Sequence, residues 1–388
     1  MPGDEAGGIM EEGVPGDPGV PAAADPLLLR LPAHLMALVA SQVEAEEARA
    51  AARLSCHALR TAVDACTTRL TWRGRSSPHA APVSLAAVLP ATCLGVVSLD
   101  CSRLVDLASL VGCPFPTQTL RINGSKVTSL RPLAESTGLR ALFCSLSQVT
   151  GLAPLAACTG LQTLDCSGTP VEDLGPLEAC RGLQCLNCSC TRVADLGPLA
   201  VCTGLITLCC SRTPVPDLAP LAACTGLRIV DFYRTAVSDL TPLARVTQLK
   251  TLDCRDTRVD SLGPLAACTG LEALDCSRTL VADLGPLSAC MALTTLNCSF
   301  SLVGSLGPLA SCTALQTLSC SCTPVPDLAP LAACRGLQSL LCVGTEVADL
   351  GPVAASTSLA NLWCDLRVPA GQISVLQALC FNLRVRQG

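Results

Sequence analysis

The stretch LQTLDCSGTPVEDLGPLEACRG (residues 161–182) is followed at once by LQCLNCSCTRVADLGPLAVCTG (183–204) and LITLCCSRTPVPDLAPLAACTG (205–226). The leucine that opens each unit recurs every 22 residues at positions 139, 161, 183, 205, 227, 249, 271, 293, 315, 337 and 359. Weaker copies begin at Thr117 and Val96, which makes about thirteen units. Such a short, fixed period predicts a solenoid, in which stacked units bury one shared core.

The consensus LxxLxCSxTxVxDLxPLxxCTG predicts the local structure of each unit. Leucine at positions 1 and 4 and cysteine at position 6 should point inward from a short extended segment, leaving positions 3, 5 and the residues after position 6 outside. Each strand should pair with the same strand of the next unit, about 4.8 Å away, in a parallel sheet. On the return side the prolines exclude long helices, and an aspartate can cap a tight turn or short 3₁₀ segment. These aspartates are Asp173, Asp195, Asp217, Asp239, Asp283, Asp327 and Asp349.

This consensus resembles the leucine-rich repeat, in particular the 22-residue internalin-like type that reads LxxLxLxxNxIxDLxPLxxLxN. The resemblance implies an α/β solenoid over residues 96–366, a horseshoe with a parallel inner β-sheet and a 3₁₀ or turn outer face. Two positions depart from the family. Cysteine replaces leucine at positions 6 and 20, and threonine replaces asparagine at position 9, where its hydroxyl can still bond nearby backbone.

The repeat also explains most of the 28 cysteines as small buried apolar residues. Cys185, Cys188 and Cys190 look like a metal-binding cluster, but Cys185 and Cys190 occupy outward or rim positions, so the three sulfurs should not converge. We therefore expect no metal, no cofactor and no catalytic thiol. The position 6 row is Cys144, Cys166, Cys188, Cys210, Cys254, Cys276, Cys298, Cys320, Cys342 and Cys364. The position 20 row is Cys158, Cys180, Cys202, Cys224, Cys268, Cys290, Cys312 and Cys334.

Charge and hydropathy exclude other partners. The net charge of −5 comes mainly from residues 1–29, which hold six acidic residues and no basic one, so the rest of the chain is near neutral. We expect no affinity for nucleic acid or anionic membranes. Residues 76–99 are uncharged but contain three prolines, which argues against a membrane span. The acidic start (1–26) predicts a disordered leader rather than a signal peptide, and hence a cytoplasmic or nuclear location.

In residues 27–72, apolar residues recur at helical spacing, and Leu31-Pro32 is followed by Leu35 and Val39. This pattern resembles the opening motif of an F-box, the module that docks onto the adaptor subunit of cullin–RING ubiquitin ligases. Leu54-Ser55-Cys56 with Leu59 matches a second part of that motif, whereas EAEEARAAA (44–52) lacks its usual leucines. The resemblance implies that the adaptor contacts are Leu31, Pro32, Leu35, Val39, Cys56 and Leu59. Alternatively, this module only caps the first repeat. Residues 73–95 are expected to form a linker with a half-repeat, and 367–388 a carboxy-terminal cap.

The unit at 227–248 breaks the pattern. It replaces both inward cysteines with Phe232 and Val246 and introduces the only tyrosine, Tyr233. Tyrosine and arginine are common at the energetic centres of interfaces. The candidate partner site is Arg228, Asp231, Tyr233, Arg234, Lys250, Asp253 and Arg255, with Phe300 and Trp363 as secondary anchors. Simple repeat drift is the alternative.

The residues indicate a binding protein rather than an enzyme, because no carboxylate pair, phosphate loop or nucleophile beside a histidine stands out. The two remaining hypotheses are an F-box/leucine-rich-repeat substrate receptor, which grips its target on the concave face, and a freestanding interaction scaffold.

Overall fold

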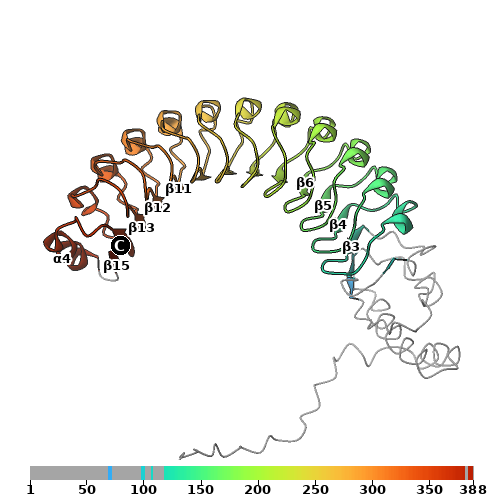
Figure 1. The fold of residues 1–388 in the computed structure, drawn as a ribbon, viewed down its shortest axis with the longest axis horizontal. Helices are drawn as coiled ribbons and strands as arrows, with labels where there is room; N and C mark the ends of the chain where they lie inside the picture. Colours follow the sequence, from blue (N-terminus) through green and yellow to red (C-terminus); the bar gives the residue numbers. More distant parts are fainter. Residues whose placement is uncertain (1–68, 72–97, 101–105, 108–117, 381–382, 388) are drawn as a thin grey trace, which may run out of the picture.

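The computed structural model describes residues 69–71, 98–100, 106–107, 118–380 and 383–387. Within these ranges the units form a single arc, with the strands on its inner side and the short 3₁₀ helices on its outer side (Figure 1). The predicted leader, most of the helical module and the six adaptor-binding candidates lie outside the described residues. So does the whole of the predicted linker, residues 73–95.

Each unit contributes one three- or four-residue strand at positions 3 to 5. The strands are β1 (Arg69–Thr71), β2 (Ser98–Asp100), β3 (Thr119–Arg121), β4 (Ala141–Phe143), β5 (Thr163–Asp165), β6 (Cys185–Asn187), β7 (Thr207–Cys209), β8 (Ile229–Asp231), β9 (Thr251–Asp253), β10 (Ala273–Asp275), β11 (Thr295–Asn297), β12 (Thr317–Ser319), β13 (Ser339–Leu341), β14 (Asn361–Cys364) and β15 (Arg384–Gln387).

Short 3₁₀ helices form the return side, and one α-helix follows the last unit. They are η3 (Arg131–Leu133), η4 (Ala153–Ala157), η5 (Gly175–Ala179), η6 (Gly197–Val201), η7 (Ala219–Ala223), η8 (Thr241–Leu243), η9 (Gly263–Leu265), η10 (Gly285–Ala289), η11 (Gly307–Ser311), η12 (Ala329–Ala333), η13 (Gly351–Val353) and α4 (Ala370–Leu379). No helix of the described part combines the length and apolar character that a membrane crossing needs.

The strands form one parallel sheet in chain order, from β1 to β15. Residues at the same position of neighbouring units face one another, as Leu164 faces Leu186 and Leu186 faces Leu208. The predicted inner sheet is therefore confirmed. One difference is at residues 69–71, which we expected at the end of the helical module but which form strand β1. At the other end, α4 and β15 follow the last unit.

The predicted aspartate caps are also confirmed. In each of the seven units the Oδ1 atom accepts a hydrogen bond from the N–H two residues later, at 2.6 to 2.9 Å. That N–H belongs to the first residue of the 3₁₀ helix, and proline follows directly after it. The aspartate thus satisfies an N–H that the short helix cannot bond, and the proline limits φ where no donor is needed.

Both cysteine rows are buried, with every member at most 1% exposed, as the sequence predicted. Burial, the main cause, raises the pKa of the Cys166 thiol to about 12 and that of Cys180 to about 11. In seven of the eight cysteines of the position 20 row the thiol also donates to the carbonyl of the same position one unit earlier, whereas Cys312 donates to the Leu287 carbonyl. Cys180 Sγ lies 3.4 Å from the Cys158 oxygen, and Cys290 Sγ lies 3.3 Å from the Cys268 oxygen.

This S–H bond explains why cysteine suits position 20 better than leucine. The acceptor carbonyl lies just past a 3₁₀ helix and accepts the thiol as a second donor, since Cys158 O also accepts from the Leu161 N–H at 2.9 Å. The same position in the unit at 337–358 holds Ser356, whose hydroxyl donates to the Cys334 oxygen at 2.9 Å. A small side chain with a donor therefore recurs at this position, whereas leucine would fill the volume without donating.

The expected bond from the position 9 hydroxyl to nearby backbone is present. Thr169 Oγ1 donates to the Cys166 oxygen at 2.5 Å, and Thr191 Oγ1 donates to the Cys188 oxygen at 2.6 Å. The bond stays within one unit, spanning three residues, and its acceptor is the backbone of the position 6 residue. Thiols at position 6 add bonds between units, as from Cys254 Sγ to the Asp275 oxygen at 3.3 Å.

Thiol labelling should separate neighbouring cysteines of the same unit. Cys190 and Cys322 are exposed, whereas Cys188 and Cys320, two residues away, are buried and have raised pKa values. Because the reactive form is an accessible thiolate, we expect maleimide to modify the exposed pair at pH 7.5 about a hundredfold or more faster than the buried pair. Peptide mass spectrometry after timed labelling measures this, and comparable rates at all four sites would contradict the buried rows.

Candidate functional site

The concave face at strands β7 to β11 carries a row of three adjacent carboxylates. Position 5 of β8, β9 and β10 is Asp231, Asp253 and Asp275, and the parallel register places each opposite the next. Cys209 and Asn297 flank this acidic row at the same position of the neighbouring strands. Strand spacing alone brings these like charges within about 5 Å per step, which is unfavourable without a cation between them.

Arg255 supplies that cation. Its Nε lies 3.1 Å from Asp253 Oδ2, and its Nη1 lies 3.9 Å from Asp275 Oδ2. The same guanidinium covers the Tyr233 ring, 4.4 Å from the centroid, and Arg212 lies 5.8 Å from that centroid. Tyrosine, arginine and aspartate side chains from three successive strands are thus joined in one cluster.

Asp253 is the member of the row whose carboxyl has a raised pKa. Burial raises the pKa of its carboxyl to about 6, and the charges of Asp231 and Asp275 add to this effect against the lowering influence of Arg255. Asp231 accepts hydrogen bonds from the Tyr233 N–H at 3.1 Å and from the Ser211 hydroxyl. Asp275 accepts from the Asn297 side-chain amide at 3.0 Å. The row is therefore well hydrogen-bonded but carries more negative charge than Arg255 balances.

The structure brings only part of the predicted site together. Tyr233, Asp253 and Arg255 are in direct contact, and Asp231 adjoins them through the backbone of Tyr233. Arg234 pairs with Asp256 at 3.7 Å. Arg228 and Lys250 occupy position 2, before the strand, where Lys250 Nζ pairs with Glu272 at 2.8 Å. Arg228 and Lys250 are therefore not part of the cluster around Tyr233.

The two secondary anchors have cationic neighbours of their own. Arg278 covers the ring of Phe300, 4.4 Å from the centroid, and Arg386 of β15 lies 5.0 Å from the centroid of Trp363. Both aromatic side chains are among the exposed large apolar residues of the described chain.

Sequence reasoning missed the backbone conformation at position 8. This residue has φ near +55° in eight units, although none of the eight is glycine: Leu146, Cys190, Arg212, Arg234, Asp256, Arg278, Phe300 and Cys322. The conformation turns the N–H toward the next unit, as from Arg212 to the Tyr233 oxygen at 2.7 Å. A side chain there costs on the order of 1 kcal/mol relative to glycine. Glycines at the same position of other units, Gly124, Gly168 and Gly344, were the signal in the sequence.

The cysteine-rich segment lacks the geometry of a metal site. Cys188 is buried, Cys190 is exposed and Cys185 is half-buried on the sheet. Across the described ranges, no three histidine, cysteine or acidic side chains are grouped so that they could hold a metal ion.

Comparison with known proteins identifies the fold. No family model matches the chain, and no curated protein matches it in sequence. Among solved structures, an internalin (InlF) from Listeria monocytogenes superposes with a TM-score of 0.65 at 23% identity, over 69% of this chain and 79% of that chain. The fold is a leucine-rich-repeat solenoid.

Two further structures have similar folds. The functional domain of InlJ from Listeria monocytogenes, which includes a cysteine ladder, has a TM-score of 0.53 at 23% identity, over 62% of this chain and 57% of that chain. The plant peptide hormone receptor RGFR1, in complex with RGF2, has a TM-score of 0.58 at 17% identity, over 72% of this chain and 52% of that chain. These likenesses support the solenoid with internalin-like repeats, and none of them supports an F-box.

Asp253 should make stability depend on pH. Because its folded pKa of about 6 exceeds the ordinary value near 3.9, the folded protein binds more protons between these two values. The free energy of unfolding therefore falls as the pH rises through this window. Above about pH 6 the Asp253 carboxyl is ionised, and its full destabilising effect is present. We expect Asp253→Asn to raise the thermal midpoint at pH 7.5 and to change it little at pH 4.

Asp239→Asn is the matched control, with the opposite sign. Hydrogen bonds from Thr241 lower the pKa of this exposed carboxyl, so its contribution is present at neutral pH and lost on acidification. Its replacement should lower the midpoint at pH 7.5. A midpoint for Asp253→Asn that falls at pH 7.5 would show that the Asp253 carboxylate is stabilising instead.

Proposed function

We propose that this chain is a protein-interaction protein that binds a partner on the concave face between β7 and β11. The observation that carries the proposal is a cluster that joins Tyr233, from the unit where the repeat pattern breaks, to Arg255 and Asp253 of the next unit. Arg255 is exposed, and Tyr233 and Asp253 are half-buried. Tyrosine and arginine are the residue types that most often dominate binding energy, and a curved sheet presents them to one ligand at the same time.

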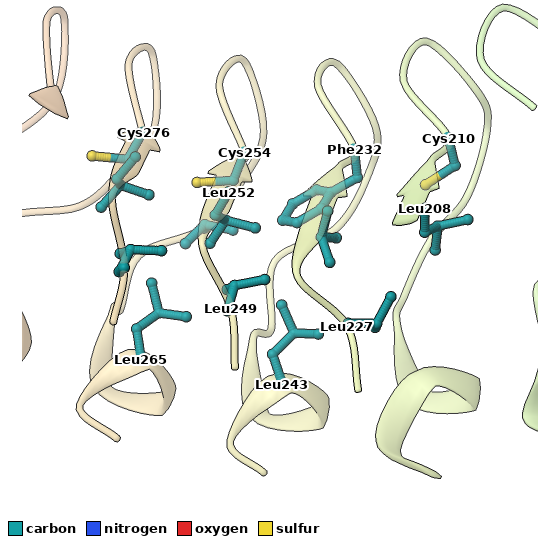
Figure 2. Packing of buried hydrophobic residues seen from close by; sticks show 14 of the residues in the cluster. Leu208, Cys210, Leu227, Phe232, Leu243, Leu249, Leu252, Cys254, Leu265 and Cys276 are labelled. Atoms are coloured by element: carbon teal, nitrogen blue, oxygen red, sulfur yellow. The ribbon is translucent and has the colours of Figure 1, made fainter. Parts of the chain in front are cut away.

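The packing beneath the cluster supports a role for the outward residues. Phe232 occupies the row formed by Cys210, Cys254 and Cys276 (Figure 2), and position 4 of the same unit is the smaller Val230 instead of leucine. A larger residue at one inward position is thus offset by a smaller one at another, which keeps the core filled. The unit is fully packed, although its sequence differs from that of its neighbours.

Binding fits this site better than catalysis. The carboxylates, the guanidinium and the backbone donors around Tyr233 already hydrogen-bond or pair with one another, which fixes their positions for recognition. The similarity to the plant receptor in complex with RGF2 adds an example of this fold with a bound ligand.

Tyr233→Ala should weaken capture of the partner by about tenfold or more, because it removes the ring on which Arg255 stacks. The partner is first identified by proximity cross-linking on the wild-type chain, and its affinity is then measured with purified protein. Arg335→Ala, an exposed arginine that follows η12, serves as the control. Undiminished affinity of the Tyr233 variant at an unchanged thermal midpoint would reject this face.

A finer hypothesis is that the chain is a substrate receptor of a cullin–RING ubiquitin ligase. It rests on the F-box-like motif alone, with Leu31, Pro32, Leu35, Val39, Cys56 and Leu59 as adaptor contacts. In this arrangement the amino-terminal module would hold the ligase, and the concave face would hold the target. The alternative is a freestanding scaffold, and for either function we propose a cytoplasmic or nuclear location.

Leu31→Asp combined with Leu35→Asp should abolish co-purification with the ligase adaptor, because charge at an apolar docking surface is strongly unfavourable. Partner binding at Tyr233 should be unaffected by this double variant. If the wild-type chain captures no adaptor under conditions in which a known F-box protein does, the scaffold hypothesis replaces the receptor hypothesis.

A further inference from the structure

Position 8 forms a row of side chains along one edge of the concave face, beside the acidic row. In the central units this edge reads Arg212, Arg234, Asp256 and Arg278, followed by Phe300. All five residues keep a side chain in a left-handed backbone conformation, where glycine would remove the strain. The units at Gly168 and Gly344 use glycine, so the side chains of the central units are not required by the fold itself.

The charges along this edge are not uniform. Arg234 and Asp256 lie at the middle of the row and pair with each other at 3.7 Å. Arg212 and Arg278, at its two ends, have no acidic partner and no side-chain hydrogen bond among the described residues. The free positive charge is therefore concentrated at two points, with a neutral pair between them.

Both end arginines are oriented by an aromatic ring. Arg212 lies 5.8 Å from the centroid of Tyr233, and Arg278 lies 4.4 Å from that of Phe300. Stacking occupies the flat face of a guanidinium and leaves its N–H edge free to bind a carboxylate through two hydrogen bonds. The partly ordered side chain loses less conformational entropy on binding than a free one.

The spacing of these two arginines indicates how far apart two carboxylates of one ligand would have to be. They lie on units three strand spacings apart, which is about 14 Å at about 4.8 Å per strand. An extended peptide rises about 3.3 Å per residue, so two acidic side chains four residues apart span about 13 Å. The neutral Arg234–Asp256 pair requires uncharged residues between them.

We propose that Arg212 and Arg278 bind an extended segment of a partner protein that runs across the strands and carries two carboxylates four residues apart, separated by uncharged residues. This inference rests on the proposed function and specifies its ligand. Arg255, paired with Asp253 and Asp275, offsets only part of the negative charge of the acidic row, so the proposed segment lies along the position 8 edge and not over that row. Tyr233 links the two surfaces, because both Arg212 and Arg255 lie over its ring.

Fluorescence anisotropy with synthetic peptides tests this on the full chain. The probe is an eleven-residue peptide of threonine, valine and serine with glutamates at positions 4 and 8, and the comparison peptides carry glutamines there or glutamates at positions 4 and 5. We expect the first peptide to bind about tenfold more tightly than either of the others, and this difference to shrink in high salt. Equal binding of all three would overturn the proposal.

Two pairs of variants separate binding from folding. Arg212→Gln with Arg278→Gln should weaken the first peptide by about tenfold, whereas Arg181→Gln, an exposed arginine after η5, should not. Arg212→Gly with Arg278→Gly should lose the same affinity without lowering the thermal midpoint, because glycine suits the left-handed backbone. Unchanged affinity in both pairs would overturn the proposal.

The remaining outcomes identify what has failed. Binding of a twelve-nucleotide oligothymidylate with the same arginine dependence would replace carboxylates with backbone phosphates and so overturn the peptide ligand. If the peptides fail while the cross-linked partner still depends on Tyr233, this inference is wrong and the proposed function stands. If Tyr233 also proves irrelevant to the partner, the proposed function fails as well.

Discussion

The parallel pairing of identical strands, about 4.8 Å apart, is the constraint on which this solenoid depends. It places each side chain against the same side chain of the next unit, so a residue suits the fold only if it can pack against copies of itself. Cysteine meets this condition at positions 6 and 20, where it is small, apolar and able to donate a weak hydrogen bond. The high cysteine content thus follows from stacking, and the raised pKa values of these thiols follow from the same burial.

The same constraint makes any departure from the repeat informative. On the inner side, Phe232 replaces cysteine and is fully buried, with the smaller Val230 in place of leucine in the same unit. On the outer side, stacking aligns Asp231, Asp253 and Asp275 into a row that is unfavourable by itself, and Arg255 partly compensates for it. The charge that remains on this face is available to a partner, which is how a regular scaffold acquires a local binding site.

Most of the fold could be predicted from the sequence because the strand and turn of each repeat unit are encoded locally and recur in every unit. The 22-residue period, the inward Leu–Leu–Cys pattern and the Asp–Leu–x–Pro turn each act within one unit, and the aspartate caps and threonine hydroxyls lie where the pattern placed them. The strand at Arg69–Thr71 was not predicted, because its segment lacks the repeat consensus and adds to the sheet through pairing with β2. The left-handed backbone at position 8 was also missed, since arginine or phenylalanine at that position does not suggest it.

The candidate site was predicted less completely than the fold. The sequence alone determined that this chain is a stack of short strands with buried thiols, and that residues 227–248 are its irregular unit. Only the tertiary structure decided which charged residues act together. It paired Lys250 with Glu272 and Arg234 with Asp256, and it left Arg212 and Arg278 without acidic partners among the described residues. The reason is physical. Packing in a solenoid depends on contacts at a fixed sequence spacing, whereas the balance of charges on its surface depends on which side chains of different units reach one another in space.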